Sequence, residues 1–218
     1  MSRPARAALK GVVWAVCLLP LLMLLWKFRA DGLGANPISY VTNVLGDTTL
    51  RLLLASLALT PLRLLSRISW QMSLRRLLGL FAFFYAVLHF TTWVVVDQFF
   101  NWAGMLADVR KRPYITVGML ALTLLVPLAA TSTTRMVKRL GGLNWQRLHR
   151  LVYAASVAAI LHFIWLAKKG RNDPYVYALI LVALLGVRLW HWTARALRRR
   201  GAVVVLAAGA QKRVVRAP

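Results

Sequence analysis

Three histidines are the residues of this chain best suited to chemistry in an apolar environment. His149 and His162 lie thirteen residues apart in one apolar stretch, residues 143–169, and His89 lies in another, residues 77–96. On a continuous helix, thirteen residues rise about 20 Å, which is most of the roughly 30 Å hydrocarbon core of a bilayer. Because polar side chains are costly at such depths, the three histidines are candidate functional residues.

The depths of His89 and His162 favour the binding of haem iron. The two stretches are expected to cross the membrane in the same direction, so both histidines fall in the outer half. Haem iron accepts one imidazole on each face, and a helix bundle supplies the apolar slot. Zinc prefers four ligands, and we expect no carboxylate or thiol within reach. Cys17 is the only cysteine and there is no C-x-x-C-H motif, so the haem would be held without covalent attachment.

The other two histidines have less obvious roles. Thirteen residues at 100° each leave about 220° after whole turns, so His149 and His162 would not face the same way on a straight helix. Either the helix is distorted or the two histidines serve different sites. Counting back thirteen residues from His89 gives Arg76 and not a histidine. His191 lies between Trp190 and Trp192, a pattern typical of the membrane interface.

The composition predicts a membrane protein. Of the 218 residues, 60% are hydrophobic, against about 45–50% in soluble proteins. Because lipid offers the backbone no hydrogen bonds, we expect an all-α bundle of six transmembrane helices, with one haem-binding domain over residues 1–200 and a basic tail over 201–218. The expected spans are residues 12–26, 44–62, 77–96, 114–132, 143–169 and 175–194. The first is expected to be a retained helix, since no signal-peptidase site follows it.

The segments between these spans are predicted to be loops, including residues 31–43, residues 98–113 and the basic segment after Ser132. Within the second span, Asp47 and Arg51 are spaced to form an ion pair on one helix face. Alternatively, Arg51 contacts a cofactor propionate or a lipid headgroup. Pro20 either kinks the first helix or is tolerated because neighbouring helices supply hydrogen-bond partners.

The basic residues behind the net charge of +24 indicate how the chain is oriented in the membrane, and they do not indicate nucleic-acid binding. The basic residues lie between apolar blocks and in the tail, and no soluble basic domain is present to hold a duplex. If the N-terminus is cytoplasmic, the cytoplasmic segments hold more than twice as many Lys and Arg residues as the outer ones. This bias predicts that both termini are cytoplasmic.

Seven motifs resemble those of one bacterial family. In chain order they are TPLR (60–63), RRLLGL (75–80), FYAVLH (84–89), RPYITVG (112–118), PLAATS (127–132), LGGLNWQRLHRLVY (140–153) and LH-x-x-W (161–165). Their order and spacing are similar to those of the MsrQ (YedZ) family, the haem-binding membrane subunits of methionine sulfoxide reductase systems. The core of that family resembles the ferric reductase and NADPH oxidase transmembrane domains.

The resemblance implies haem b with His89 and His162 as the axial pair, and His149 as the candidate ligand of a second haem. It also implies FMN, for which this sequence offers no recognisable motif. The implied partner is MsrP, a periplasmic molybdopterin enzyme that repairs oxidised envelope proteins. Electrons would come from a cytoplasmic flavin reductase or the quinone pool, through a subunit in the bacterial inner membrane.

Two other functions compete with electron transfer. A transporter or proton channel would use the histidines as proton relays, although such proteins usually bury more carboxylates than this chain has. A purely structural subunit would only anchor a partner. Since no nucleophile–base pair or paired carboxylates occur, substrate chemistry in this chain alone is not expected.

Overall fold

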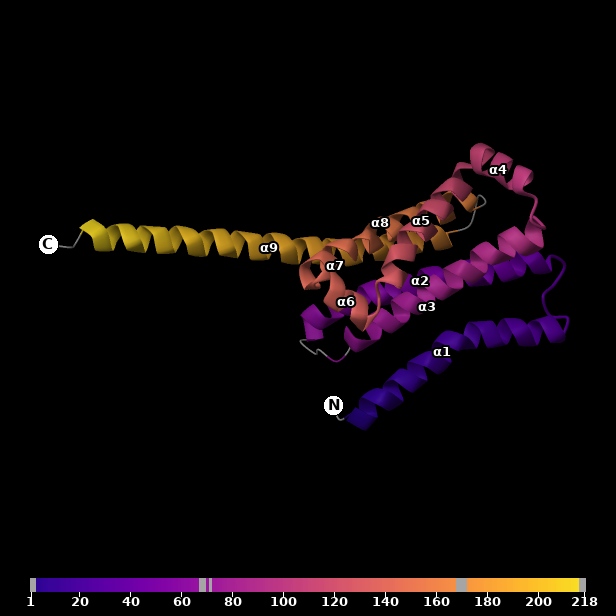
Figure 1. The fold of residues 1–218 in the computed structure, drawn as a ribbon, viewed down its shortest axis with the longest axis horizontal. Coiled ribbons are helices and arrows are strands. Elements are labelled where there is room, and N and C mark those ends of the chain that lie inside the picture. Colours follow the sequence, from indigo (N-terminus) through magenta and orange to yellow (C-terminus); the bar gives the residue numbers. More distant parts are fainter. Residues whose placement is uncertain (1–2, 67–69, 71, 168–171, 216–218) are drawn as a thin grey trace.

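The computed structural model describes residues 3–66, 70, 72–167 and 172–215, which form helices and no strand. Figure 1 shows their arrangement. The elements are α1 (Arg3–Arg29), α2 (Pro37–Ser66), α3 (Met72–Thr91), the π-helix η1 (Thr92–Asp97), α4 (Trp102–Lys111), α5 (Pro113–Ala130), α6 (Thr134–Leu140), α7 (Gly142–Leu148), α8 (Leu151–Leu166) and α9 (Asp173–Val215). Six segments are long and apolar enough to span a bilayer: α1, α2, α3 with η1, α5, α7 with α8, and α9. The predicted six-span, all-α fold is confirmed.

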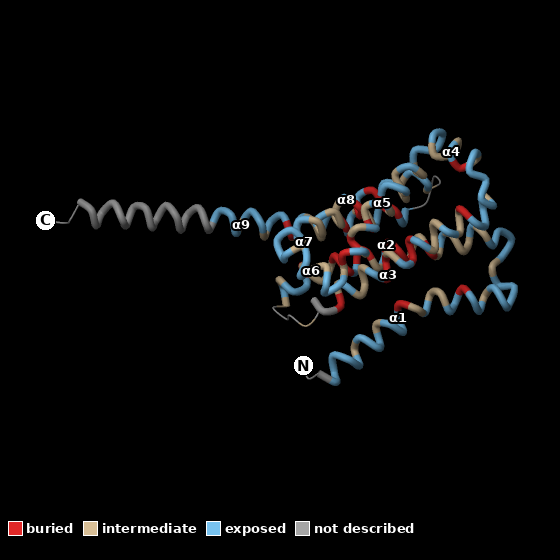
Figure 2. Tube along the Cα trace, in the orientation of Figure 1, coloured by how far each residue is buried: buried red, intermediate tan, exposed pale blue. Residues whose placement is uncertain are grey.

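Helix α2 is the centre of the bundle. Its buried residues belong to three apolar clusters: Leu53 packs with α3, α5 and α8, Leu45 with α1 and α3, and Leu50 with α8 and α9. The most apolar part of α2 is 39% buried, against 11% for α1 and α9 (Figure 2). The outer helices leave many large apolar side chains exposed, as expected of surfaces that face lipid.

Three predictions of loops were wrong in part or in full. Residues 98–113 contain α4, whose first turn is capped by the Asn101 side chain accepting from the Gly104 amide. The segment after Ser132 contains α6, capped in the same way by Thr133. Residues 31–43 end in the first turns of α2, which begins at Pro37, because proline favours the first helical position.

The predicted fifth span is divided at His149. Helix α7 ends at Leu148 and α8 begins at Leu151, and Gly141, with a φ of 74°, forms the turn before α7. A distortion, one of the two alternatives that the spacing of His149 and His162 left open, is therefore present. The predicted end of this stretch, Lys168 and Lys169, lies outside the described residues.

Helix α9 is longer than the predicted sixth span. It continues to Val215, across the proposed domain end at residue 200. Residues 216–218 of the predicted tail lie outside the described residues.

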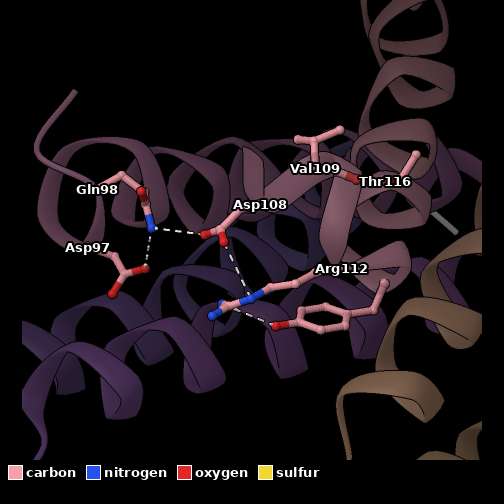
Figure 3. A network of polar contacts seen from close by, with 7 residues as sticks. Asp97, Gln98, Asp108, Val109, Arg112 and Thr116 are labelled. Atoms are coloured by element: carbon pink, nitrogen blue, oxygen red, sulfur yellow. Dashed lines mark hydrogen bonds and ion pairs between the residues drawn. The ribbon is translucent and has the colours of Figure 1, made fainter. Parts of the chain in front are cut away.

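The two ends of the bundle are named here after the short helices that lie there. At the α4 end, α4 crosses from η1 to α5, and at the α6 end, α6 joins α5 to α7 (Figure 1). A polar network connects α4 to its neighbours (Figure 3). Asp108 pairs with Arg112 at 3.4 Å and accepts from Gln98 at 3.3 Å, and Thr116 donates to the Val109 carbonyl at 2.7 Å. These bonds fix α4 across the start of α5.

Tyr85 of α3 supplies a hydrogen bond beside a proline in α1. Pro20 has no amide hydrogen, and α1 bends near its middle (Figure 1). The fully buried Tyr85 hydroxyl donates to the Cys17 carbonyl, three residues before Pro20, at 2.6 Å. A neighbouring helix therefore supplies a polar partner at the bend.

We expect Tyr85→Phe to lower the free energy of unfolding by about 0.5–1.5 kcal/mol, because it removes a buried hydrogen bond between α3 and α1. Unfolding in increasing SDS, followed by circular dichroism, measures the change. Tyr175→Phe, at a tyrosine that is 61% exposed, is the matched control. Equal effects of the two substitutions would contradict this role for the Tyr85 hydroxyl.

Candidate functional site

The structure brings His89 and His162 together near the α4 end. His89 lies two residues before the end of α3, and His162 lies in the last turns of α8. Their ring centroids are 6.2 Å apart and the ring planes are nearly perpendicular, at 82°. The prediction that the two histidines lie at one depth is confirmed.

Main-chain carbonyls orient both rings. His89 Nδ1 lies 2.9 Å from the Thr42 carbonyl oxygen of α2, and His162 Nδ1 lies 2.7 Å from that of Tyr114 at the start of α5. Because a carbonyl oxygen can only accept, each Nδ1 must carry the hydrogen and donate it. Each Nε2 therefore keeps its lone pair, as is usual for histidines that bind a metal.

Two glycines make room for these rings. A Cβ on Gly118 of α5 would lie 2.8 Å from His162 Nδ1, and a Cβ on Gly46 of α2 would lie 3.2 Å from His89 Nδ1. Only glycine leaves this space without a shift of the imidazole. The positions of both rings thus depend on the backbones of α2 and α5 as well as on α3 and α8.

The two histidines line a cavity of about 280 Å³ between α2, α3, η1, α5 and α8. Most of its wall is apolar, with Leu50, Phe90 and Phe163 among the lining residues. Polar residues lie at the α4 end of the cavity, and they include Asp97, Arg112 and Tyr114. A ligand in this cavity would meet an apolar interior and a polar rim.

The separation of the rings fits one metal ion between them. Two metal–nitrogen bonds of about 2.0–2.1 Å, together with the half-widths of two imidazoles, require ring centres roughly 6 Å apart. Among the described residues, no three His, Cys, Asp or Glu side chains come together to hold an ion. The arrangement therefore suits a metal whose other ligands come from a bound cofactor.

His149 lies apart from this pair, at the α6 end. Its Nε2 is 3.1 Å from the Thr131 hydroxyl, and its ring stacks on Trp145 with centroids 3.9 Å apart. Arg75 of α3 lies close enough to His149 for its charge to act on the imidazole. Arg76, which lies thirteen residues before His89 in the sequence, is exposed. His191, with exposed Trp190 and Trp192 on either side, is half-buried on α9.

Arg51 makes a contact that the sequence did not indicate. Its Nε donates to the Tyr177 hydroxyl of α9 at 2.8 Å. Asp47, one turn earlier on α2, lines the cavity. The predicted ion pair between Asp47 and Arg51 stays a prediction.

Sequence reasoning missed the groups that orient the two imidazoles. The carbonyls of Thr42 and Tyr114 leave no signature in the sequence, since every residue has a carbonyl. Gly46 and Gly118 did offer a signal, because a glycine inside an apolar helix often marks a close approach.

Comparisons with known proteins agree with the fold and with the motifs. The family of ferric reductase-like transmembrane components matches residues 11–160. A protein of Herminiimonas arsenicoxydans is 50% identical over 198 residues, 89% of this chain and 90% of its own. One of Rhodospirillum rubrum is 51% identical over 188 residues, covering 86% and 88%, and one of Bordetella pertussis is 46% identical over 205 residues, covering 93% and 97%. All three are named protein-methionine-sulfoxide reductase heme-binding subunit MsrQ.

We expect Gly118→Ala to displace the His162 ring and to cost about 1–3 kcal/mol of stability through overpacking. Gly186→Ala is the control, because a Cβ there meets nothing within 4 Å and alanine favours the helix by up to about 1 kcal/mol. SDS unfolding of both variants measures the difference. A Gly118→Ala variant as stable as the Gly186→Ala variant would contradict the close packing of His162.

Proposed function

The chain belongs to the MsrQ family of ferric reductase-like transmembrane proteins, and on this basis we propose that it binds haem b between His89 and His162 and conducts electrons across the membrane. The single observation that carries the proposal is the pair of neighbouring imidazoles, with ring centroids 6.2 Å apart, each with Nδ1 bonded to a carbonyl. The haem, when bound, would supply one-electron redox chemistry at a buried iron.

The protein's own contribution is to hold and insulate the cofactor. His89 and His162 line the cavity from two helices, and the carbonyls of Thr42 and Tyr114 keep the rings in the tautomer that leaves the Nε2 lone pair available. The apolar wall excludes water, and burial of this kind is one of the ways a protein sets a haem potential. A proton relay requires imidazoles that exchange protons, so the fixed Nδ1 hydrogens favour ligation over transport.

The proposed direction of electron flow rests on the topology that we expect from the charge distribution. By the positive-inside rule, we expect the α6 end and both termini in the cytoplasm, and hence His89 and His162 toward the periplasm. We propose that the chain lies in the bacterial inner membrane and delivers electrons to a periplasmic molybdopterin enzyme, MsrP. Its donor would be a cytoplasmic flavin reductase or the quinone pool. FMN remains part of the proposal by family membership, without assigned residues.

His149 is the candidate ligand for a second haem at the α6 end. Its Nε2 would have to leave Thr131 to bind iron, while Nδ1 has no such contact among the described residues. A haem at each end would shorten the distance that an electron must cross in one step.

We expect His89→Ala and His162→Ala each to abolish binding of the haem at the α4 end, because a single remaining imidazole leaves one face of the iron without its ligand. Pyridine haemochrome assays on detergent-purified protein give the haem per chain. His191→Ala, at a half-buried histidine outside the cavity, is the control.

If His149→Ala loses a different haem, there are two sites, and if it keeps the full amount, there is one. Wild-type protein without haem would overturn the proposal and favour proton transport.

We expect the reduced, haem-loaded protein to be reoxidised when MsrP and a methionine-sulfoxide peptide are added together. Absorbance of the haem over time measures the rate. Either addition alone is the control, since both are needed to accept electrons. No acceleration with both present would contradict MsrP as the partner.

A further inference from the structure

All five acidic side chains of the protein lie toward the α4 end. Asp31, Asp97 and Asp108 lie in or beside the segments at that end, and Asp173 lies at the start of α9. Asp47 lies about ten residues, or roughly 15 Å, inside α2. The half of the bundle toward the α6 end therefore contains no carboxylate side chain to balance a buried positive charge.

Arg188 of α9 is such a charge, with only 4% of its surface exposed. One terminal nitrogen donates to the Leu57 carbonyl of α2, and the other donates to the Tyr153 hydroxyl at 2.5 Å. The first bond has a clear cause. Pro61, four residues after Leu57, has no amide hydrogen, so the helix itself leaves this carbonyl without a donor. The third nitrogen of the guanidinium, Nε, has no hydrogen-bond partner among the described residues.

The only other buried side-chain atom without a partner in the described residues is the hydroxyl oxygen of Thr60. Thr60 lies three residues after Leu57, on the same face of α2. Two hydrogen-bonding groups without partners thus lie in one region of the bundle, where α2 meets α9. Since buried polar groups are nearly always bonded, their coincidence indicates a missing polar ligand.

A second arginine adds to the positive charge in this region. Arg75 of α3 adjoins α2, because Ser56 donates its hydroxyl to the Arg75 carbonyl at 3.0 Å. Its guanidinium is close enough to that of Arg188 for the two charges to repel each other. Burying charge without a counter-ion is strongly unfavourable. A water molecule would satisfy hydrogen bonds here but would leave both charges unbalanced.

We propose that this region binds a phosphate-type oxyanion between α2, α3 and α9, and we call it the arginine site, defined by Thr60, Arg75 and Arg188. The anion accepts hydrogen bonds from Arg188 Nε and the Thr60 hydroxyl, and Arg75 supplies the second positive charge. Charge-assisted bonds from arginine to phosphate are short and strong. The source of the phosphate is either the headgroup of an anionic lipid or a soluble phosphate, since basic pockets between membrane helices bind such headgroups.

Native mass spectrometry of the full-length, haem-loaded protein tests the proposal. One arm presents micelles with equal amounts of phosphatidylglycerol and phosphatidylcholine, and the other presents inorganic phosphate alone. We expect wild-type protein to retain one phosphate-bearing ligand per chain, and Arg188→Gln to weaken binding by ten-fold or more. Arg110→Gln is the matched control, because Arg110 is an exposed arginine of α4, at the other end of the bundle.

Thr60→Val keeps the shape of the side chain and leaves the bonds of Arg188 intact, so it tests the site even if Arg188→Gln fails to fold. We expect it to weaken binding about five-fold, the effect of one hydrogen bond. Retention of phosphatidylglycerol that phosphate does not displace identifies a lipid, and binding of phosphate alone identifies a soluble ligand. Wild-type protein that retains neither, or equal retention in wild type, Thr60→Val and Arg188→Gln, would overturn the proposal.

Discussion

In a hydrocarbon core, a polar group that finds no partner within the protein finds none at all, and this constraint accounts for most of the contacts described above. The carbonyls of Thr42 and Tyr114 take the Nδ1 hydrogens of the two central histidines. The Tyr85 hydroxyl bonds a carbonyl beside Pro20, and Arg188 bonds the carbonyl that Pro61 leaves free. In each case a side-chain donor on one helix bonds a main-chain carbonyl of another helix, so these hydrogen bonds determine which helices must be neighbours.

The same constraint gives the two ends of the bundle different chemistry. At the α4 end, acidic side chains lie among basic ones, and Asp108 pairs with Arg112. At the α6 end, basic residues have no acidic side chain to balance them, which suits a surface that meets negatively charged lipid. The paired histidines lie near the α4 end, where the lining of the cavity includes Asp47, Asp97 and Arg112.

The sequence predicted best what depends on length and hydropathy. Because helices rise by a fixed amount per residue, the depths of His89 and His162 could be compared without a structure. Orientation could not be predicted in this way. The break between α7 and α8 depends on how residues around His149 pack. Helix α4 is held by the Asn101 cap and by the bond from Thr116 of α5 to the Val109 carbonyl. The bond from Arg188 to Leu57 joins residues 131 positions apart, and only Pro61 hinted that a donor was needed.

The use of main-chain carbonyls to hold the histidines affects how this site can change in evolution. A side-chain partner, such as the aspartate that often orients a metal-binding histidine, is lost by a single substitution. A carbonyl survives any substitution that leaves the backbone path intact, so Thr42 and Tyr114 are free to drift without loss of the orienting bonds. Besides the two histidines themselves, the most constrained positions are Gly46 and Gly118, where an added side-chain atom would press on an imidazole. In this site, selection should therefore preserve the space beside each imidazole more strictly than the identity of the residues that orient the rings.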